Sequence, residues 1–364
     1  MRKWIRAFCI ILLVCTSGCL PTYTIEDIQI MQAVGYDYVD EESISGTASV
    51  GVYTPSEGQA SLEGETFHVI GRNTREIQRK MNLESPRPLV NGKLSVVLIS
   101  DQLAQRGFRE IIDSYAREPD ISRKMYLAIV EGNTKEMLEG DYKLTQSVTQ
   151  YIKNQLDQNL ERNFPTTNIH EFLNAYFGKG KDPFLPLLST KGNKIEISGF
   201  AVFKDDQLIE KIHSKSFLLK TLIEGFETGA YDASVENDLI SFDNIGSAVH
   251  IGYSKSKGTP QFQIKVKIKG QYEEAKNKSF VKTTDIKGLE KQVKKSLEEE
   301  LTSLVRHFQE IKVDPLGLGN IARSQDRNWN EKTFYQQYPK IPIKVDVDFQ
   351  LLEIGIIDDG KEYK

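Results

Sequence analysis

The pattern of apolar and polar residues in the first half of the chain alternates between strand-like and helix-like stretches. Apolar residues recur through segment 24–39 and segment 45–52 alternates, which predicts a helical turn leading into a strand and a second strand paired with it. The runs at 94–99 and 125–130 are almost wholly apolar, as is typical of buried strands. Strands separated by helices are therefore expected over this half.

The predicted helices of the same half begin at capping residues. Asn73 stands three residues before Glu76, the spacing of a capping box, and predicts a helix over 74–83. Ser100 is placed to cap a second helix directly after a buried strand. Segment 141–177 is also helical in pattern and is broken into two pieces by an internal proline. Alternating strands and helices predict a sheet with crossover helices on its faces.

A connector rich in glycine, lysine and proline at 178–186 precedes a second half dominated by strand-like patterns. We place the domain boundary there, with an N-terminal domain over 19–185, which could hold two subdomains, and a C-terminal domain over 186–364. The residue pair 205–206, Asp-Asp, forms the turn of an expected hairpin. The strands expected in this half span 194–204, 208–212, 235–242, 248–253, 262–268 and 342–357, with a short helix over 217–223.

The longest helix is expected over 286–311. Its apolar residues recur at steps of three and four, its other side is polar, and Glu290 is spaced to pair with Lys294. Such a stripe usually covers a sheet of its own domain, and the alternative is a helix that binds a partner or a membrane surface. We expect the first. The predicted fold class is therefore α+β and multi-domain, with mixed β-sheets each covered by helices and the long amphipathic helix packed on an antiparallel sheet of the C-terminal domain.

The N-terminus has the features of an export signal. Three cations fall within the first six residues, an apolar run follows at 7–14, and small residues lead to Cys19. A run this short cannot cross a bilayer, which needs about 20 apolar residues. Residues 1–18 are therefore predicted to be a lipoprotein signal peptide that is removed.

The cysteine count supports lipid attachment at Cys19. Of the three cysteines, Cys9 and Cys15 lie in the part to be removed, so Cys19 is the sole cysteine of the mature protein and no internal disulfide can form. We therefore predict that Cys19 carries the lipid. Two or more acyl chains attached there would anchor the protein stably. Thr16 stands where such signals usually have Leu, and the alternative is ordinary cleavage that releases a secreted protein.

Composition and charge narrow the class of partner. With 39% hydrophobic and 27% charged residues, the chain has an ordinary globular composition. Its net charge of −4 becomes −7 once the three cations of the signal are lost. An acidic body argues against nucleic-acid binding and against membrane attachment through a basic patch. Membrane attachment would then come from the lipid.

The sequence contains no recognisable constellation of catalytic or metal-ligating residues. The five histidines are widely spaced and form neither an HxH nor an HExxH pair, so we expect no metal site. There is neither a GxSxG elbow nor a Walker phosphate loop. We therefore predict no catalytic residue, no cofactor and no metal.

Three weaker motifs have structural interpretations. Segment 317–322 matches the GxGxxA form of a dinucleotide turn, but that turn follows a buried strand and this one follows a long helix. The aspartate pairs at 205–206 and 358–359 fall where a hairpin or a chain end needs polar turn residues. We expect no nucleotide or calcium site at any of them.

The aromatic residues Trp329, Tyr335 and Tyr338 cluster near a proline late in the chain. Large rings in such a position either pack an irregular connector against the C-terminal domain or form a surface that a partner uses. We expect packing.

Further segments, taken in order, carry a family resemblance. They are Cys19, 28–37, 98–107, 115–118, 199–204, the long helix, 314–319, Arg323, Trp329, 345–348 and Gly355. Together they resemble the Ger(x)C family, the lipoprotein C subunits of the nutrient germinant receptors of spore-forming bacteria. The resemblance covers nearly all of the mature chain, with Tyr335 standing where a second Trp is expected.

The resemblance implies a non-enzymatic receptor subunit required for spore germination in response to nutrients. It would dock on the two integral membrane subunits of the same receptor and be held by its lipid on the outer face of the spore inner membrane. Two alternatives stay open. A lipid-anchored solute-binding protein that binds the germinant directly would need a deep polar pocket between its domains, and an extracytoplasmic hydrolase would need a nucleophile in contact with a base.

Overall fold

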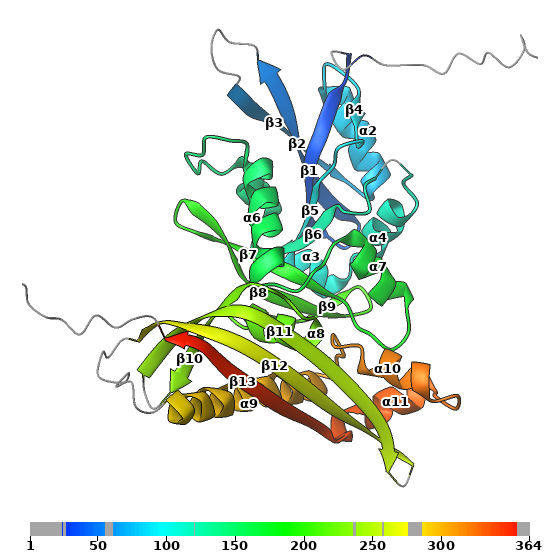
Figure 1. The fold of residues 1–364 in the computed structure, drawn as a ribbon. Helices are drawn as coiled ribbons and strands as arrows, with labels where there is room; N and C mark the ends of the chain where they lie inside the picture. Colours follow the sequence, from blue (N-terminus) through cyan, green and yellow to red (C-terminus); the bar gives the residue numbers. More distant parts are fainter. Residues whose placement is uncertain are drawn as a thin grey trace, which may run out of the picture.

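A computed structural model describes residue 24 and residues 27–54, 61–119, 121–235, 238–256, 258–275 and 286–354. Within these residues the chain forms two β-sheets, a nine-stranded sheet and a four-stranded sheet, each packed against helices (Figure 1). Cys19 and the signal segment lie outside the described residues, as does the aspartate pair at 358–359.

The larger sheet has the strand order β3-β2-β1-β5-β6-β7-β8-β9, with β4 paired to β1. The central strands β1, β5, β6 and β7 are parallel, and the strands on both sides of them pair antiparallel. The strands are β1 (Gln29–Asp40), β2 (Ser43–Thr54), β3 (Ser61–Gly71), β4 (Leu89–Val90), β5 (Val96–Ser100), β6 (Tyr126–Val130), β7 (Phe184–Lys191), β8 (Lys194–Lys204) and β9 (Gln207–His213).

Helices cover both faces of this sheet, which explains the apolar runs of β5 and β6. Every residue of β5 is buried, as expected of parallel strands with helices on both sides. Side chains of α2, α3, α4 and α7 pack on one face, and those of α5 and α6 pack on the other. The helices are α2 (Thr74–Glu84), α3 (Asp101–Arg106), α4 (Arg109–Ala116), α5 (Thr134–Glu139), α6 (Val148–Arg162) and α7 (Ile169–Phe177).

The capping residues define the helix starts as predicted. Asn73 Oδ1 accepts a hydrogen bond from Glu76 N at 2.9 Å, and Ser100 Oγ accepts one from Leu103 N at 3.3 Å. The helix expected after Ser100 is split into α3 and α4 at Gly107, which has a φ of 96° that disfavours a side chain. The short helix α5 was not anticipated from the sequence.

The smaller sheet has the order β10-β11-β12-β13. The strands expected over 235–242 and 248–253 are not separate, because a single strand, β11, continues from one to the other with an irregularity near Gly246. The sheet that was expected to be antiparallel is mixed, because the chain crosses over through α9 and β13 then pairs parallel to β12. The elements are α8 (Ser216–Ile223), β10 (Gly229–Val235), β11 (Asp238–Ser256), β12 (Thr259–Ala275), α9 (Ile286–Glu310), α10 (Leu318–Gln325), α11 (Glu331–Gln337), the 3-10 helix η3 (Tyr338–Lys340) and β13 (Ile343–Ile354).

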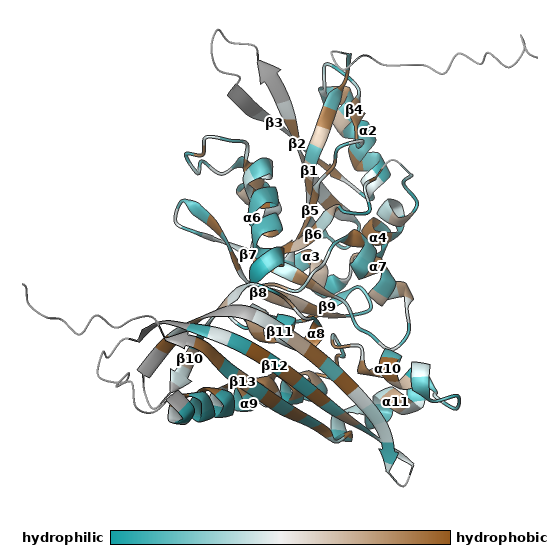
Figure 2. Ribbon diagram, in the orientation of Figure 1, coloured by the Kyte–Doolittle hydropathy of each residue, from teal (hydrophilic) through white to brown (hydrophobic). Residues whose placement is uncertain are grey.

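The helix α9 covers the smaller sheet with its apolar stripe, as predicted. Leu297 and Leu301 are at most 1% exposed, whereas the hydrophilic side of α9 is outward in Figure 2. The ion pair expected between Glu290 and Lys294 does not form among the described residues, because Glu290 Oε1 accepts from Leu351 N of β13 at 2.9 Å. The predicted α+β, multi-domain class with helix-covered sheets is confirmed.

The two sheets share one apolar core, which includes side chains of α8 and α9. Phe200 of β8 and Phe308 of α9 have ring centroids 6.4 Å apart, and both side chains are fully buried. The boundary expected between 185 and 186 falls inside β7, and β8 and β9 continue the larger sheet beyond it. Strand pairing places the change from the larger to the smaller sheet after β9. The position of the boundary between the two domains stays a prediction.

Candidate functional site

A groove of about 1030 Å³ lies between β9 and the outward side of α9. The β9 side of the groove includes Glu210, Lys211, Ile212 and His213. The α9 side is lined by polar residues spaced along most of the helix. Those used below are Lys291, Lys294, Ser303, Arg306 and His307.

One wall of the groove is a sheet edge. Among the described strands, β9 pairs with β8 alone, so its other edge has no strand partner. Ser214 N donates to Ser198 O at 3.0 Å just beyond the strand. In an antiparallel ladder, residues whose N–H and C=O groups bond to the partner strand alternate with residues whose groups point away from it. Because Ser214 bonds to the partner strand, the N–H and C=O groups of Lys211 and His213 point to the open edge.

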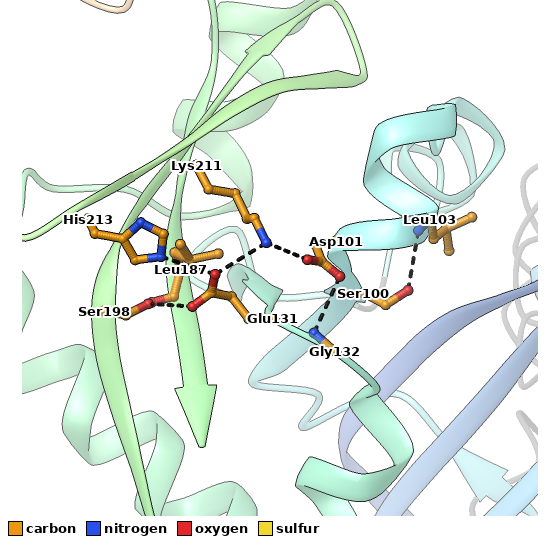
Figure 3. A network of polar contacts seen from close by, with 9 residues as sticks. All are labelled: Ser100, Asp101, Leu103, Glu131, Gly132, Leu187, Ser198, Lys211 and His213. Atoms are coloured by element: carbon orange, nitrogen blue, oxygen red, sulfur yellow. Dashed lines mark hydrogen bonds and ion pairs between the residues drawn. The ribbon is translucent and has the colours of Figure 1, made fainter. Parts of the chain in front are cut away.

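A network of four charged or titratable side chains lies beneath this edge (Figure 3). Lys211 Nζ lies 2.6 Å from Asp101 Oδ2 and 3.2 Å from Glu131 Oε1. Asp101 directly follows β5 and Glu131 directly follows β6. Because β5 and β6 are parallel, their carboxyl ends meet at one edge of the sheet, which brings the two carboxylates to the same lysine.

Glu131 connects the lysine to the rest of the network. Its Oε1 lies 3.0 Å from His213 Nε2, and its Oε2 accepts from Ser198 Oγ at 3.2 Å. Burial alone would raise the pKa of Glu131, but hydrogen bonds from His213 and Lys211 outweigh it and lower the pKa. Burial opposes the charge of Lys211 too, but hydrogen bonds to Asp101 and Glu131 raise its pKa. The lysine and Glu131 are therefore both ionised near neutral pH.

The geometry of this network favours a fixed charged platform over a catalytic centre. A lysine nucleophile or base needs a lowered pKa, and that of Lys211 is raised. Ser198 Oγ donates to Glu131 and not to a histidine, so the described residues here do not form a serine and histidine pair. Further along the groove, His307 Nε2 lies 2.9 Å from Glu210 Oε1, which joins α9 to β9.

A second lysine and carboxylate cluster connects the end of β8 to the loop before α10. Lys204 Nζ lies 2.9 Å from Asp182 Oδ1, and Asp182 Oδ2 accepts from Asp314 N at 2.8 Å. Lys204 Nζ also lies 3.8 Å from the ring centroid of Tyr335. We call the residues Asp182, Lys204 and Asp314 the buried cluster, and the residues Asp101, Glu131, Lys211 and His213 the edge network.

The buried cluster explains the glycine-rich segment 317–322. The side chain of Asp314 is fully buried and accepts from Leu318 N at 3.0 Å and from Gly319 N at 2.8 Å, which satisfies the start of α10. A Cβ on Gly319 would lie 2.8 Å from Gly180 Cα, so close backbone packing requires the glycine. Burial raises the pKa of Asp314 to about 7. The segment therefore serves packing between two loops.

The other residues singled out from the sequence have structural positions where they are described. Asp205 has a φ of 54° in the turn between β8 and β9, and Asp206 Oδ2 accepts from Arg109 N at 3.0 Å. Trp329 and Tyr335 pack around Phe334, with ring centroids 6.2 Å and 5.4 Å from it. Tyr338 belongs to the same aromatic cluster and is 0% exposed, which confirms the packing interpretation.

No group of three or more His, Cys, Asp or Glu side chains among the described residues is arranged to hold a metal ion. None of the helices in the described part is both long and apolar enough to cross a bilayer.

The edge network was not predicted. Asp101 directly follows the predicted cap residue Ser100, and His213 is one of the five widely spaced histidines, but neither Glu131 nor Lys211 belongs to a local motif. The usable signal was that Asp101 and Glu131 each follow a buried strand, where parallel strands bring their ends together. The position of β9 against those ends could not be read from local patterns.

Two family models match the chain in consecutive segments. The one described as the N-terminal domain of spore germination proteins matches residues 22–190, and the one described as spore germination B3/GerAC-like, C-terminal, matches residues 198–355. The segment between the two matches, 191–197, spans the turn from β7 to β8. Together the models account for most of the chain.

Curated relatives and a solved structure match over nearly the same extent. Spore germination protein GerQC of Bacillus cereus is 28% identical over 98% of this chain and 100% of its own length. Spore germination protein KC of Bacillus subtilis (strain 168) is 20% identical over 98% of this chain and 97% of its own. The crystal structure of the GerBC protein superposes with a TM-score of 0.59 at 18% identity, covering 88% of this chain and 97% of that one. The last of these shows a shared fold.

Proposed function

The chain belongs to the family of GerAC-like spore germination proteins, and from this premise we propose that it is a non-enzymatic lipoprotein subunit of a nutrient germinant receptor. The observation that carries the proposal is the pair of family matches, which run in order from residue 22 to residue 355. Relatives named for spore germination align over nearly their whole length, so the resemblance is not confined to one shared domain.

We propose that Cys19 anchors the mature protein to the outer face of the spore inner membrane. The support is the position of Cys19 after a short apolar run and its being the sole cysteine of the mature chain. From that anchor the body would dock on the two integral membrane subunits of the same receptor. Docking would support receptor assembly or the transmission of the nutrient signal.

A role without catalysis is supported by the state of the polar groups. In the edge network Lys211 is held protonated between two carboxylates, and in the buried cluster Asp314 is occupied by backbone N–H groups. The alternative of a solute-binding protein has less support, since several polar groups of the groove already pair with each other, as His307 does with Glu210.

Germination of spores tests the proposal. Spores that lack the protein should fail to respond to the nutrients sensed by its receptor and should still germinate with agents that bypass receptors. Spores carrying Cys19→Ala should show the same selective loss, with the protein unprocessed or released from membranes. An unchanged nutrient response in the deletion strain, or mature protein that starts at another residue, would contradict the proposal.

A further inference from the structure

The groove combines two features that each suit an extended polypeptide. Its β9 wall presents unpaired backbone positions at Lys211 and His213, where a further strand can add to the sheet. Charged side chains on an edge strand normally discourage such pairing. Here the charge of Lys211 is neutralised by Asp101 and Glu131 under the edge, so it does not repel an incoming strand.

The α9 wall has an excess of unpaired positive charge. Lys291, Lys294 and Arg306 of α9, with Lys215 just after β9, line the groove and form no ion pair within the described part of the chain, whereas Glu298 is the one lining carboxylate there without an ion pair. The other groove cations are paired, Lys211 with Asp101 and Glu131 and Lys295 with a glutamate. From Lys291 to Arg306 the helix rises about 22 Å, which is about the length of seven residues of extended chain.

We infer that this groove binds an extended, acidic segment from an extracytoplasmic part of an integral membrane partner subunit, which lies along the edge of β9 and faces the cations of α9. The inference rests on the proposed function and specifies the docking surface. Charge complementarity identifies the occupant: the whole chain has a net charge of −4, yet along this groove the lining cations without an ion pair outnumber the lining carboxylates without one. A concave site with a strand edge suits a chain segment better than it suits a flat bilayer.

Position-specific photocrosslinking in spore membranes tests the inference with the full-length lipoprotein. Ser303 is exposed on the groove side of α9, and Ser324 is exposed on α10 outside the residues that line the groove. Each serine is replaced in turn by the photoreactive amino acid benzoylphenylalanine. We expect position 303 to give an adduct that maps to an acidic, extracytoplasmic segment of a membrane subunit, and position 324 to give none with that segment.

Second substitutions separate charge from backbone pairing. The double substitution Lys291→Glu and Lys294→Glu should reduce the adduct at position 303 by about tenfold, because the groove and the acidic segment then carry like charges. Lys332→Glu, at an exposed position of α11, is the control and should leave the adduct unchanged. His213→Pro removes the N–H at the open edge and should also lower the adduct, whereas His213→Ala keeps that N–H and should not. Both His213 variants lose the contact with Glu131, so their difference isolates the backbone.

Several results would overturn the inference. They are adducts at position 303 with lipid, with a second copy of this chain or within the same chain, no adduct there, or an adduct that survives the charge reversal. If position 303 is silent while the protein still co-purifies with the membrane subunits, the groove is not the docking surface and the proposed function stands. If the protein co-purifies with neither subunit, the proposed function fails as well.

Discussion

The buried cluster and the edge network each combine a lysine with two carboxyl groups and differ in what surrounds them. In the buried cluster Asp314 is fully buried, the Asp182 side chain is 8% exposed, and the carboxylates accept from backbone N–H groups of a loop. In the edge network Asp101, Glu131 and Lys211 are 17%, 24% and 27% exposed, and Lys211 lines the groove. One cluster therefore joins the two halves of the molecule, and the other shapes a surface.

The difference appears in the titration of the carboxyl groups. Burial dominates at Asp314 and raises its pKa to about 7, because the nearby Lys204 and two backbone N–H groups only partly offset the loss of water. At Glu131 burial is outweighed by the hydrogen bonds from His213 and Lys211, so its pKa is lowered. A lysine beside a carboxylate is thus no guide to function until burial is known.

The largest expected effect lies on the helix that borders the groove. Leu301→Asp places a charge in the core between α9 and the smaller sheet, where Leu301 is 0% exposed. The expected cost is several kcal/mol, comparable with the whole stability of a domain. Circular dichroism and thermal melting of the protein expressed from Thr24 onward would measure it. Ser303→Asp, two residues away on the exposed side, is the matched control and should melt like the parent.

The next effect concerns pH. The pKa of Asp314 is raised to about 7 in the folded protein, so the folded state binds the proton more tightly than the unfolded chain does. Its contribution to stability is therefore fully present below the ordinary aspartate pKa of about 3.9 and is lost as pH rises towards about 7. Glu131, with a lowered pKa, acts in the opposite sense and loses its contribution as pH falls.

The substitution Asp314→Asn isolates the pH-dependent contribution of Asp314 to stability, because asparagine keeps an acceptor oxygen and does not titrate. The parent should lose stability relative to the variant between pH 4 and pH 7, by an amount on the order of a few kcal/mol. Urea unfolding of both proteins across that range would measure the difference. Parallel pH profiles would show that Asp314 does not titrate in the folded state as described.

A smaller effect is expected when each of the two lysines, Lys204 and Lys211, is replaced and the losses of stability are compared. Lys204→Ala leaves the buried Asp182 without its ion pair and should cost about 2 kcal/mol. Lys211→Ala leaves Asp101 and Glu131 partly solvated and should cost about 1 kcal/mol or less. Urea midpoints of the two variants decide the order. A larger loss for Lys211→Ala would reverse the assignment of structural and surface roles.

The smallest effect on stability is expected from Lys294→Glu, which changes an exposed side chain of the groove. Its free energy of unfolding should stay within about 0.5 kcal/mol of the parent. The nutrient response of spores should nevertheless weaken, since the charge faces the proposed docking site. A normal response at normal protein levels would argue that this end of the groove is not used.

Much of the fold was predictable because its signals are local. The cap at Asn73 and the stripe of α9 each depend on residues a few positions apart, and both formed as expected. The strands expected over 235–242 and 248–253 are joined in the long strand β11, because its ladder with β12 continues past Gly246. Pairing with a neighbouring strand overrides such a local signal.

The candidate site was less predictable because it is assembled over long distances in the sequence. Lys211 meets Asp101 across 110 positions, and Asp314 meets Asp182 across 132 positions. Neither contact leaves a periodic pattern in the chain. The sequence does show that Asp101 and Glu131 each follow a buried strand. It does not show that β9 lies beside them, and without that strand the edge network cannot be inferred.

Co-purification from spore inner membranes tests the central claim most directly. The full-length protein, tagged at its C-terminus, would be solubilised in mild detergent and its partners identified by mass spectrometry, with Cys19→Ala as the unanchored control. The account predicts that the two integral membrane subunits of one germinant receptor are recovered with the parent and are depleted with the variant. Recovery of the lipidated protein without either subunit, from membranes in which both are present, would contradict it.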